Sequence, residues 1–220
     1  MQSIASSTHF RESFNSLRNN IMFVSSGKAK CIAVTSSTTN DGKTTVTTCL
    51  AKSFASAYEK VLLIDADMRN PSVHQSFSMK NIDGLSSVLE DKRNAVNIYK
   101  LENLPSLYVL PAGSRPKDPS KVLSSIEMDR FLKQMRNTFD FVLIDTPPVL
   151  PVPDTAALAR IVDGTVVVAR HGITSESLLL RTKKTLELAN VNVLGVVLND
   201  MPVDTLHSYG SPQRHRKRLF

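Results

Sequence analysis

The sequence lacks an apolar run of about 18 residues or more, and it contains only two cysteines. A helix that crosses a bilayer needs about 20 apolar residues, so we expect no membrane-spanning segment. The opening residues, MQSIASSTHFRESF, also lack the charged start and the apolar run of a secretory signal. Cys31 and Cys49 have no metal-ligand spacing and lie among apolar residues, so we expect free thiols in a cytosolic protein rather than a disulfide.

Acidic residues are outnumbered by basic ones, and the formal net charge is +7. Part of this excess lies in the C-terminal RHRKRLF, since removing its four Arg and Lys residues would lower the charge by four, to +3. This run is either a solvated tail or a contact for an anionic membrane surface. We expect no nucleic-acid binding, because the run is short, terminal and without interleaved aromatic residues.

Apolar runs without alternation predict buried parallel strands, and they cover residues 31–37, 61–67, 141–148, 164–170 and 193–200. Helical spacing of apolar residues occurs between them, at 43–58, 125–139 and 175–190. This order predicts an α/β fold with a mostly parallel sheet flanked by helices on both faces. We expect surface connections over 89–104 and 111–120. Phe10, Phe14, Leu17 and Ile21 predict an amphipathic helix over about 9–24.

Glycine is scarce in the segment that most resembles a phosphate-binding loop. SSTTNDGKTTVTT, residues 36–48, has Gly42, Lys43 and Thr44, but Ser37 stands where the pattern G-x-x-x-x-G-K-[ST] has its first glycine. The segment follows a predicted strand and opens a predicted helix, so its N–H groups would face an anion. Asn40 and Asp41 are the residue types other than glycine that best tolerate positive φ. We therefore interpret the segment as a phosphate-binding loop of the P-loop NTPase type.

Carboxylates end two of the predicted strands. LLIDADMRNP supplies Asp65 and Asp67, with Arg69 nearby, and FVLIDTPP supplies Asp145. Because the carboxyl ends of parallel strands meet at one sheet edge, we expect these side chains beside the loop, where they would anchor Mg²⁺. An alternative for each Asp is that it caps the following turn or helix. Arg69 either steadies charge at the site or pairs with a nearby Asp.

The segments at 35–45, 61–71 (VLLIDADMRNP) and 139–158 (FDFVLIDTPPVLPVPDTAAL) together resemble the bacterial tyrosine kinases of capsule and exopolysaccharide export, in their separate Gram-positive form. The resemblance implies that Lys43, Asp65, Asp67 and Asp145 form the catalytic set, with Asp65 taking the tyrosine proton. It implies Mg²⁺ contacts from Thr44, Asp67 and Asp145. It implies nucleotide contacts from Thr38, Thr39, Asn40, Asp41, Gly42, Lys43, Thr44 and Thr45. Asn199 either faces the adenine or forms a turn.

Two segments differ from the family pattern. Family loops commonly read Pro-Gly-Glu-Gly-Lys-Ser, whereas Thr39-Asn40-Asp41 precede Gly42 here. The family's N-terminal helix carries Glu-x-x-Arg-x-x-Arg for ring assembly. Here Glu12 and Arg18 match as expected oligomer contacts, but Asn15 replaces the first Arg, which would weaken assembly.

A third departure concerns the tail: the family tail carries several tyrosines that are autophosphorylated, whereas this tail has Tyr209 alone. The resemblance implies that Tyr209 is the phosphate acceptor. The alternative is an incidental tyrosine in a flexible segment. Tyr58, Tyr99 and Tyr108 lie in predicted folded parts, so we expect them to be less accessible.

We therefore expect a kinase domain over 1–205 and a flexible basic tail over 206–220, using ATP/ADP and Mg²⁺. The resemblance implies a membrane-anchored activator whose cytoplasmic end docks on the chain, self-association into a ring or smaller oligomer, and a cognate tyrosine phosphatase. The protein would act in the cytoplasm, at the inner face of the membrane, controlling polysaccharide polymerisation and export. Two alternatives remain open: a MinD/ParA-type ATPase, and a nucleotide-binding adaptor of an export complex.

Overall fold

The computed structural model describes residues 8–90, 98–150 and 154–202. Within these residues a seven-stranded sheet has the order β3-β4-β2-β5-β1-β6-β7. The strands are β1 (Cys31–Ser36), β2 (Val61–Asp65), β3 (Tyr99–Leu101), β4 (Leu104–Leu110), β5 (Phe141–Asp145), β6 (Gly164–Arg170) and β7 (Val193–Asn199). β3 runs antiparallel to β4, and the other neighbouring pairs are parallel. The predicted α/β fold with a mostly parallel sheet is confirmed.

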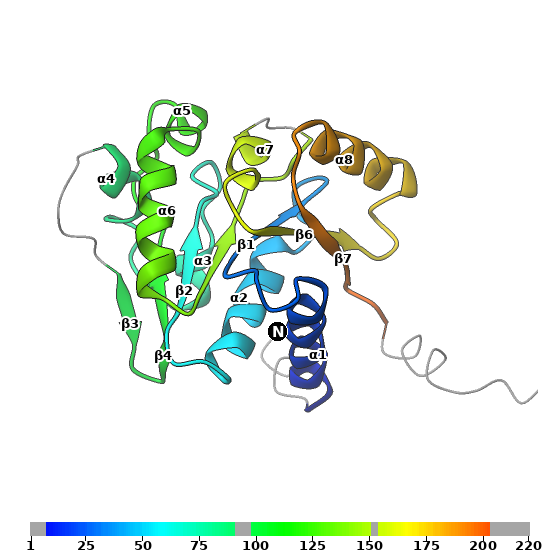
Figure 1. The fold of residues 1–220 in the computed structure, drawn as a ribbon, viewed down its shortest axis with the longest axis horizontal. Helices are drawn as coiled ribbons and strands as arrows, with labels where there is room; N and C mark the ends of the chain where they lie inside the picture. The colour runs from blue at the N-terminus through cyan, green and yellow to red at the C-terminus, as the bar shows by residue number, and fades with distance from the viewer. Residues whose placement is uncertain (1–7, 91–97, 151–153, 203–220) are drawn as a thin grey trace, which may run out of the picture.

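Helices cover both faces of this sheet (Figure 1). On one face lie α1 (Thr8–Val24) and α2 (Lys43–Ala55). On the other lie α4 (Leu85–Glu90), α5 (Pro119–Leu123), α6 (Ile126–Thr138) and α7 (Asp154–Ala159). α8 (Glu176–Leu188) packs with α7 against β6, and the short α3 (Val73–Ser76) follows β2.

The residues of β1 show why the apolar runs do not alternate. Ile32 and Val34 pack into the core beneath α1 and α2. Cys31 and Ala33, which point the other way, pack into the core beneath α4, α5 and α6. All four side chains are fully buried. A strand with helices on both faces is mostly apolar, and β1 follows this pattern over residues 31–34. The predicted burial of 193–200 is wrong, because β7 lies at the sheet edge and exposes Val193, Val196 and Leu198.

The two expected surface connections are wrong in part. Residues 89–104 contain β3 and the start of β4, although β3 is a short edge strand with two exposed residues and therefore has no apolar pattern. In 111–120, the carbonyl oxygens of Pro111 and Ala112 accept hydrogen bonds from Leu85 N (2.8 Å) and Ser86 N (2.9 Å). This segment is held against α4, and Pro111, Ala112 and Gly113 are buried.

The predicted amphipathic helix and the two free thiols are both present. α1 packs Phe14, Leu17 and Ile21 on the core that it shares with α2. Cys31 is buried and Cys49 is half-buried, and neither forms a disulfide. Burial raises the pKa of the Cys31 thiol to about 12, so this thiol stays protonated at physiological pH.

Membrane-spanning helices were not expected. Across residues 8–90, 98–150 and 154–202, no helix combines the length and the apolar character that crossing a bilayer requires.

Candidate active site

The loop between β1 and α2 has the backbone shape of a phosphate-binding loop in spite of its single glycine. Asn40 and Gly42 both have positive φ, 65° and 88°. A side chain at Gly42 would displace Asn199, because a Cβ there would lie 2.0 Å from Asn199 Nδ2, and the positive φ disfavours it as well. Of the two residues expected to tolerate positive φ, Asn40 adopts it and Asp41 does not. Asn40 therefore supplies one of the left-handed positions that glycine usually provides.

Asp41 closes the loop with its side chain. Its carboxylate is fully buried, and Oδ2 accepts hydrogen bonds from Thr38 N at 3.0 Å and Thr38 Oγ1 at 3.2 Å. A buried carboxylate is costly unless it accepts several hydrogen bonds. The Asp41 carboxylate therefore holds the loop together.

The first turn of α2 brings the loop to the carboxylate at the end of β5. Thr44 Oγ1 donates to Asp145 Oδ2 at 2.5 Å, and Thr47 Oγ1 donates to Asp145 Oδ1 at 3.2 Å. Lys43, next to Thr44, is buried with 7% of its surface exposed. Two predicted motifs that are 101 residues apart in the sequence therefore meet in one contact. A helix N-terminus, a lysine and a hydroxyl beside a carboxylate suit a bound phosphate group with its metal ion.

The carboxylate at the end of β2 lies beside the one at the end of β5, as expected. Asp65 is the neighbour of Asp145 in the register of the two strands, and both are fully buried. Asp65 Oδ1 accepts from Asp67 N at 3.1 Å, and Oδ2 accepts from Ser72 N and Val73 N, each at 3.0 Å. The chain after β2 thus wraps around Asp65. The alternative role expected for this residue, capping the turn or helix that follows, is therefore also present.

Burial raises the pKa of both carboxyls of this pair. Burial, and then the nearby charge of Asp145, raises the pKa of Asp65 to about 8. Burial also raises the pKa of Asp145 to about 6, and the hydrogen bond from Thr44 and the charge of Lys43 partly offset this effect. Near neutral pH, with no cation nearby, the pair therefore holds about one proton, mainly on Asp65. Neutralising both negative charges requires additional positive charge at this edge of the sheet.

Several contacts at the site had no signal in the sequence. Ser72 Oγ lies 2.8 Å from Thr44 Oγ1, so a residue of the loop after β2 contacts the first turn of α2. Arg69 Nη2 donates to Ser120 Oγ at 2.9 Å, which leaves open the two roles considered for this arginine. Asn199 Nδ2 donates to the carbonyl oxygen of Asp41 at 3.1 Å, so Asn199 contacts the phosphate loop itself.

The described residues of the expected oligomer motif lie away from this site. Arg18 Nη1 donates to Ser53 O at 2.6 Å, and Ser53 Oγ donates to Asn15 Oδ1 at 2.8 Å. These residues of the expected oligomer motif therefore join α1 to α2 within the chain, while Glu12 is exposed. Tyr209 lies outside the described residues.

The other tyrosines lie within the fold, as expected, but they differ in exposure. Tyr58 and Tyr108 are half-buried and contact other rings, whereas Tyr99 on the edge strand is 38% exposed.

The fold and the site define a P-loop nucleotide-binding protein. Comparison with known proteins agrees: a family model described as AAA domain matches residues 29–189. The tyrosine-protein kinase CpsD of Streptococcus agalactiae is 37% identical over 212 residues, which cover 94% of this chain and 92% of CpsD. The chain belongs to the bacterial tyrosine-protein kinases of capsule and exopolysaccharide biosynthesis.

Solved structures share the same fold. The chimerical protein CapA2B2 is 32% identical with a TM-score of 0.84, over 91% of this chain and 88% of that one. The septum site-determining protein MinD from Pyrococcus horikoshii, complexed with Mg-ADP, is 23% identical with a TM-score of 0.64, over 81% of this chain and 76% of that one. The likeness to MinD shows the fold alone. The likeness to CpsD and to CapA2B2 confirms the family that the three sequence segments resemble.

Proposed function

We propose that this tyrosine-protein kinase is an ATP- and Mg²⁺-dependent autokinase that phosphorylates Tyr209, and that it regulates capsular or exopolysaccharide polymerisation and export. The observation that carries the proposal is the contact of Thr44 with Asp145, beside Asp65 and at the start of α2. This contact brings the N-terminus of α2, which suits a phosphate group, next to the carboxylates that end β2 and β5. Phosphoryl transfer needs a phosphate-binding site and carboxylates close together.

The residues present fit a nucleotide with one divalent cation. The N–H groups at the start of α2 and Lys43 would hold the terminal phosphates, as would the loop residues 38–45. The hydroxyl of Thr44 and the carboxylates of Asp145 and Asp67 would hold Mg²⁺, directly or through water, and Mg²⁺ usually keeps several waters beside one or two carboxylates. Bound there, the cation would neutralise charge on the transferred phosphoryl group. It would also lower the pKa of Asp65 and Asp145, which burial and neighbouring carboxylates raise.

Asp65 would accept the proton of the acceptor tyrosine. Its Oδ2 already accepts two hydrogen bonds, but Oδ1 accepts one, so one acceptor position remains on Oδ1. In the reaction, the tyrosine oxygen gains the phosphoryl group from ATP, the tyrosine proton passes to Asp65, and ADP leaves. A pKa raised by burial makes the ionised carboxylate a stronger base than an exposed Asp.

Partners and location follow from the family. A membrane-anchored activator would dock on the chain through its cytoplasmic end and would bring the kinase to the inner face of the membrane; the likeness to the chimerical protein CapA2B2 supports this proposal. Self-association would present Tyr209 to a neighbouring subunit, with the exposed Glu12 of α1 at the contact. A cognate tyrosine phosphatase would reverse the reaction.

The test incubates the purified chain, mixed with or fused to a candidate activator tail, with Mg²⁺-ATP, and maps phosphate by mass spectrometry. The test variant is Tyr209→Phe. The matched control is Tyr99→Phe, which removes an exposed tyrosine of the folded domain. We expect phosphate on Tyr209 that disappears in Tyr209→Phe and persists in Tyr99→Phe. ATP hydrolysis without phosphotyrosine would instead indicate the MinD/ParA-type ATPase, and nucleotide binding without turnover would indicate the adaptor.

A further inference from the structure

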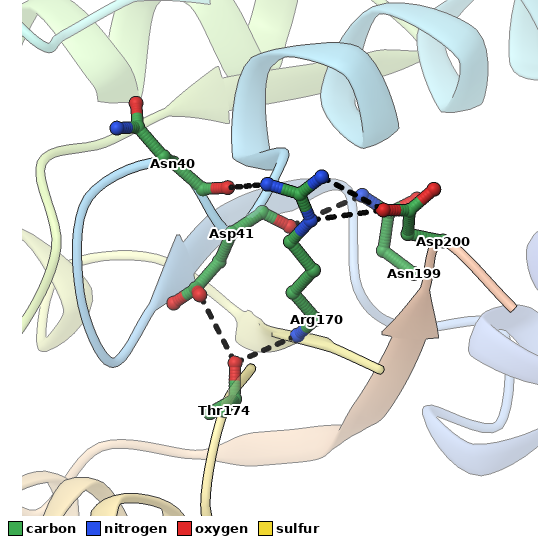
Figure 2. Close-up of polar contacts among 6 residues, drawn as sticks. All are labelled: Asn40, Asp41, Arg170, Thr174, Asn199 and Asp200. Atoms are coloured by element: carbon green, nitrogen blue, oxygen red, sulfur yellow. Dashed lines mark hydrogen bonds and ion pairs between the residues drawn. The ribbon is translucent and has the colours of Figure 1, made fainter. Parts of the chain in front are cut away.

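A polar network joins the phosphate loop to the carboxyl ends of β6 and β7 (Figure 2). Its members are Asn40 and Asp41 of the loop, Arg170 at the end of β6, Thr174 in the turn before α8, and Asn199 and Asp200 at the end of β7. The two sides of the network are about 130 residues apart in the sequence, since Asp41 and Thr174 are separated by 133 positions. None of these contacts involves the carboxylates that end β2 and β5.

Two of the contacts fix carbonyl groups of the loop. Asn199 Nδ2 donates to Asp41 O at 3.1 Å, and Arg170 Nη1 donates to Asn40 O at 3.4 Å. In a planar trans peptide the C=O and the following N–H point in opposite directions. Holding these two oxygens toward β6 and β7 therefore turns the N–H groups of Asp41 and Gly42 to the opposite side. N–H groups turned in this way are what a phosphate-binding loop presents to an anion.

Thr174 fixes the side chain of Asp41. Its hydroxyl accepts a hydrogen bond from Arg170 N at 2.7 Å and donates to Asp41 Oδ1 at 3.0 Å. A hydroxyl has a single proton to donate, so the bond from Arg170 N leaves that proton directed at the carboxylate. Thr38 occupies the other oxygen of Asp41. Without Thr174 the buried Oδ1 would lose this donor, and the loop would have to move to regain one.

Arg170 is aimed at the loop by an ion pair with Asp200. Its Nε and Nη2 lie 2.9 and 2.8 Å from Asp200 Oδ2. The two side chains are 41% and 58% exposed, so the pair adds little to stability. Its contact with Asn40 O is also the longest of the network. Thr174 and Asn199, which are half-buried, are therefore the stronger restraints on the loop.

We propose that Thr174 and Asn199 are positioning residues of the nucleotide site. They hold the peptide units of Asn40 and Asp41 so that the loop N–H groups face the phosphates, a geometry that other loops reach through additional glycines. This inference rests on the proposed function, because it assigns these residues to the binding of ATP. They act through the loop and are not catalytic residues.

The variants that test this role are Thr174→Val, which keeps the side-chain shape without the hydroxyl, and Thr174→Ser, which keeps the hydroxyl. Thr185→Val is the matched control, because that hydroxyl donates within α8, to Arg181 O at 3.0 Å. We expect Thr174→Val to raise the Kd for ATP and the KM for ATP about tenfold, the effect of losing one hydrogen bond to a buried charge. The kcat of Thr174→Val at saturating ATP should stay within about twofold of wild type. Thr174→Ser should restore ATP binding, and Thr185→Val should bind ATP as wild type does.

Hydrogen exchange of the nucleotide-free chain tests the positioning itself. We expect faster exchange over residues 38–44 in Thr174→Val, with unchanged exchange in β1, β2 and β5. Unchanged exchange in the loop, or an equal increase throughout the chain, would overturn the proposed role. If wild type binds no ATP while loop exchange still increases in Thr174→Val, the proposed function fails and the positioning of the loop stands.

Discussion

Asp145→Asn tests whether the buried negative charge at the end of β5 destabilises the nucleotide-free protein. Asp145 accepts hydrogen bonds from the hydroxyls of Thr44 and Thr47, and both hydroxyls can rotate to suit an amide. The substitution therefore keeps the packing of the site and removes one negative charge beside Asp65. It changes electrostatics more than shape, so its effect should depend on pH.

The sign and size of the effect follow from the pKa of Asp145. In the folded chain this pKa is raised from 3.8 to about 6, so the folded state binds the proton more tightly than the unfolded state. Stability from this group is therefore greatest at low pH and falls as the pH rises through about 6. Between pH 5 and about 6 the unfolded carboxyl is ionised and the folded one is not, which corresponds to about 1.4 kcal/mol. The variant does not titrate at position 145, so it should gain at least about that much relative to wild type between pH 5 and 8, because losing the charge of Asp145 also lowers the pKa of Asp65.

The free energy of unfolding is measured by urea titration in EDTA, without nucleotide, at pH 5 and pH 8. Far-UV circular dichroism is the probe, because the chain contains no tryptophan. Glu102→Gln, at an exposed carboxylate in the turn between β3 and β4, is the control and should show no such gain. A difference between Asp145→Asn and wild type that is the same at both pH values would refute the reasoning, and so would a loss of relative stability at pH 8.

Three further predictions concern the loop, α1 and the thiols. Asn40→Val should lower the free energy of unfolding by about 1–2 kcal/mol in urea titration, because a β-branched residue resists the positive φ at position 40, whereas Asn40→Gly should not; equal stability of the two variants would contradict this. Arg18→Met should lower it by about 1 kcal/mol, through loss of the hydrogen bond to Ser53 O, and Arg11→Met, at an exposed arginine, should leave it unchanged; an equal loss in both would argue against the α1–α2 link. In the native chain a thiol reagent should leave Cys31 unmodified until urea exposes it, because this thiol is buried and its pKa is raised; rapid native labelling of Cys31 would be inconsistent with the fold.

The sheet and its ligand edge were predictable because their signals are local. The buried strands begin with continuous apolar runs, residues 31–34 in β1 and 141–144 in β5, as expected where helices cover both faces. The similar run of β7 is mostly exposed, because β7 lies at the sheet edge. Asp65 and Asp145 end buried runs, so the meeting of parallel strand ends predicted that they would be neighbours. The left-handed position at Asn40 was also predictable, from the conformations that its side chain tolerates.

The remaining features depend on contacts between distant segments. β3 has three residues at the sheet edge and acquires its conformation from pairing with β4, not from a pattern of its own. Thr174 and Asn199 reach the loop from 133 and 158 positions away, and neither lies in a motif that identifies its partner. Nothing in the sequence around Asp41 indicated that its carboxylate would accept hydrogen bonds from both Thr38 and the distant Thr174.

The most direct test of the central claim is the binding of ATP to the nucleotide-free chain, measured by isothermal titration calorimetry with Mg²⁺ and with EDTA. The account predicts saturable binding of one ATP per chain, weaker in EDTA and lost in Lys43→Met, since Lys43 lies buried at the start of α2 beside Thr44. Absence of binding in wild type, or equal binding in Lys43→Met, would contradict the claim that this glycine-poor loop is a working phosphate site.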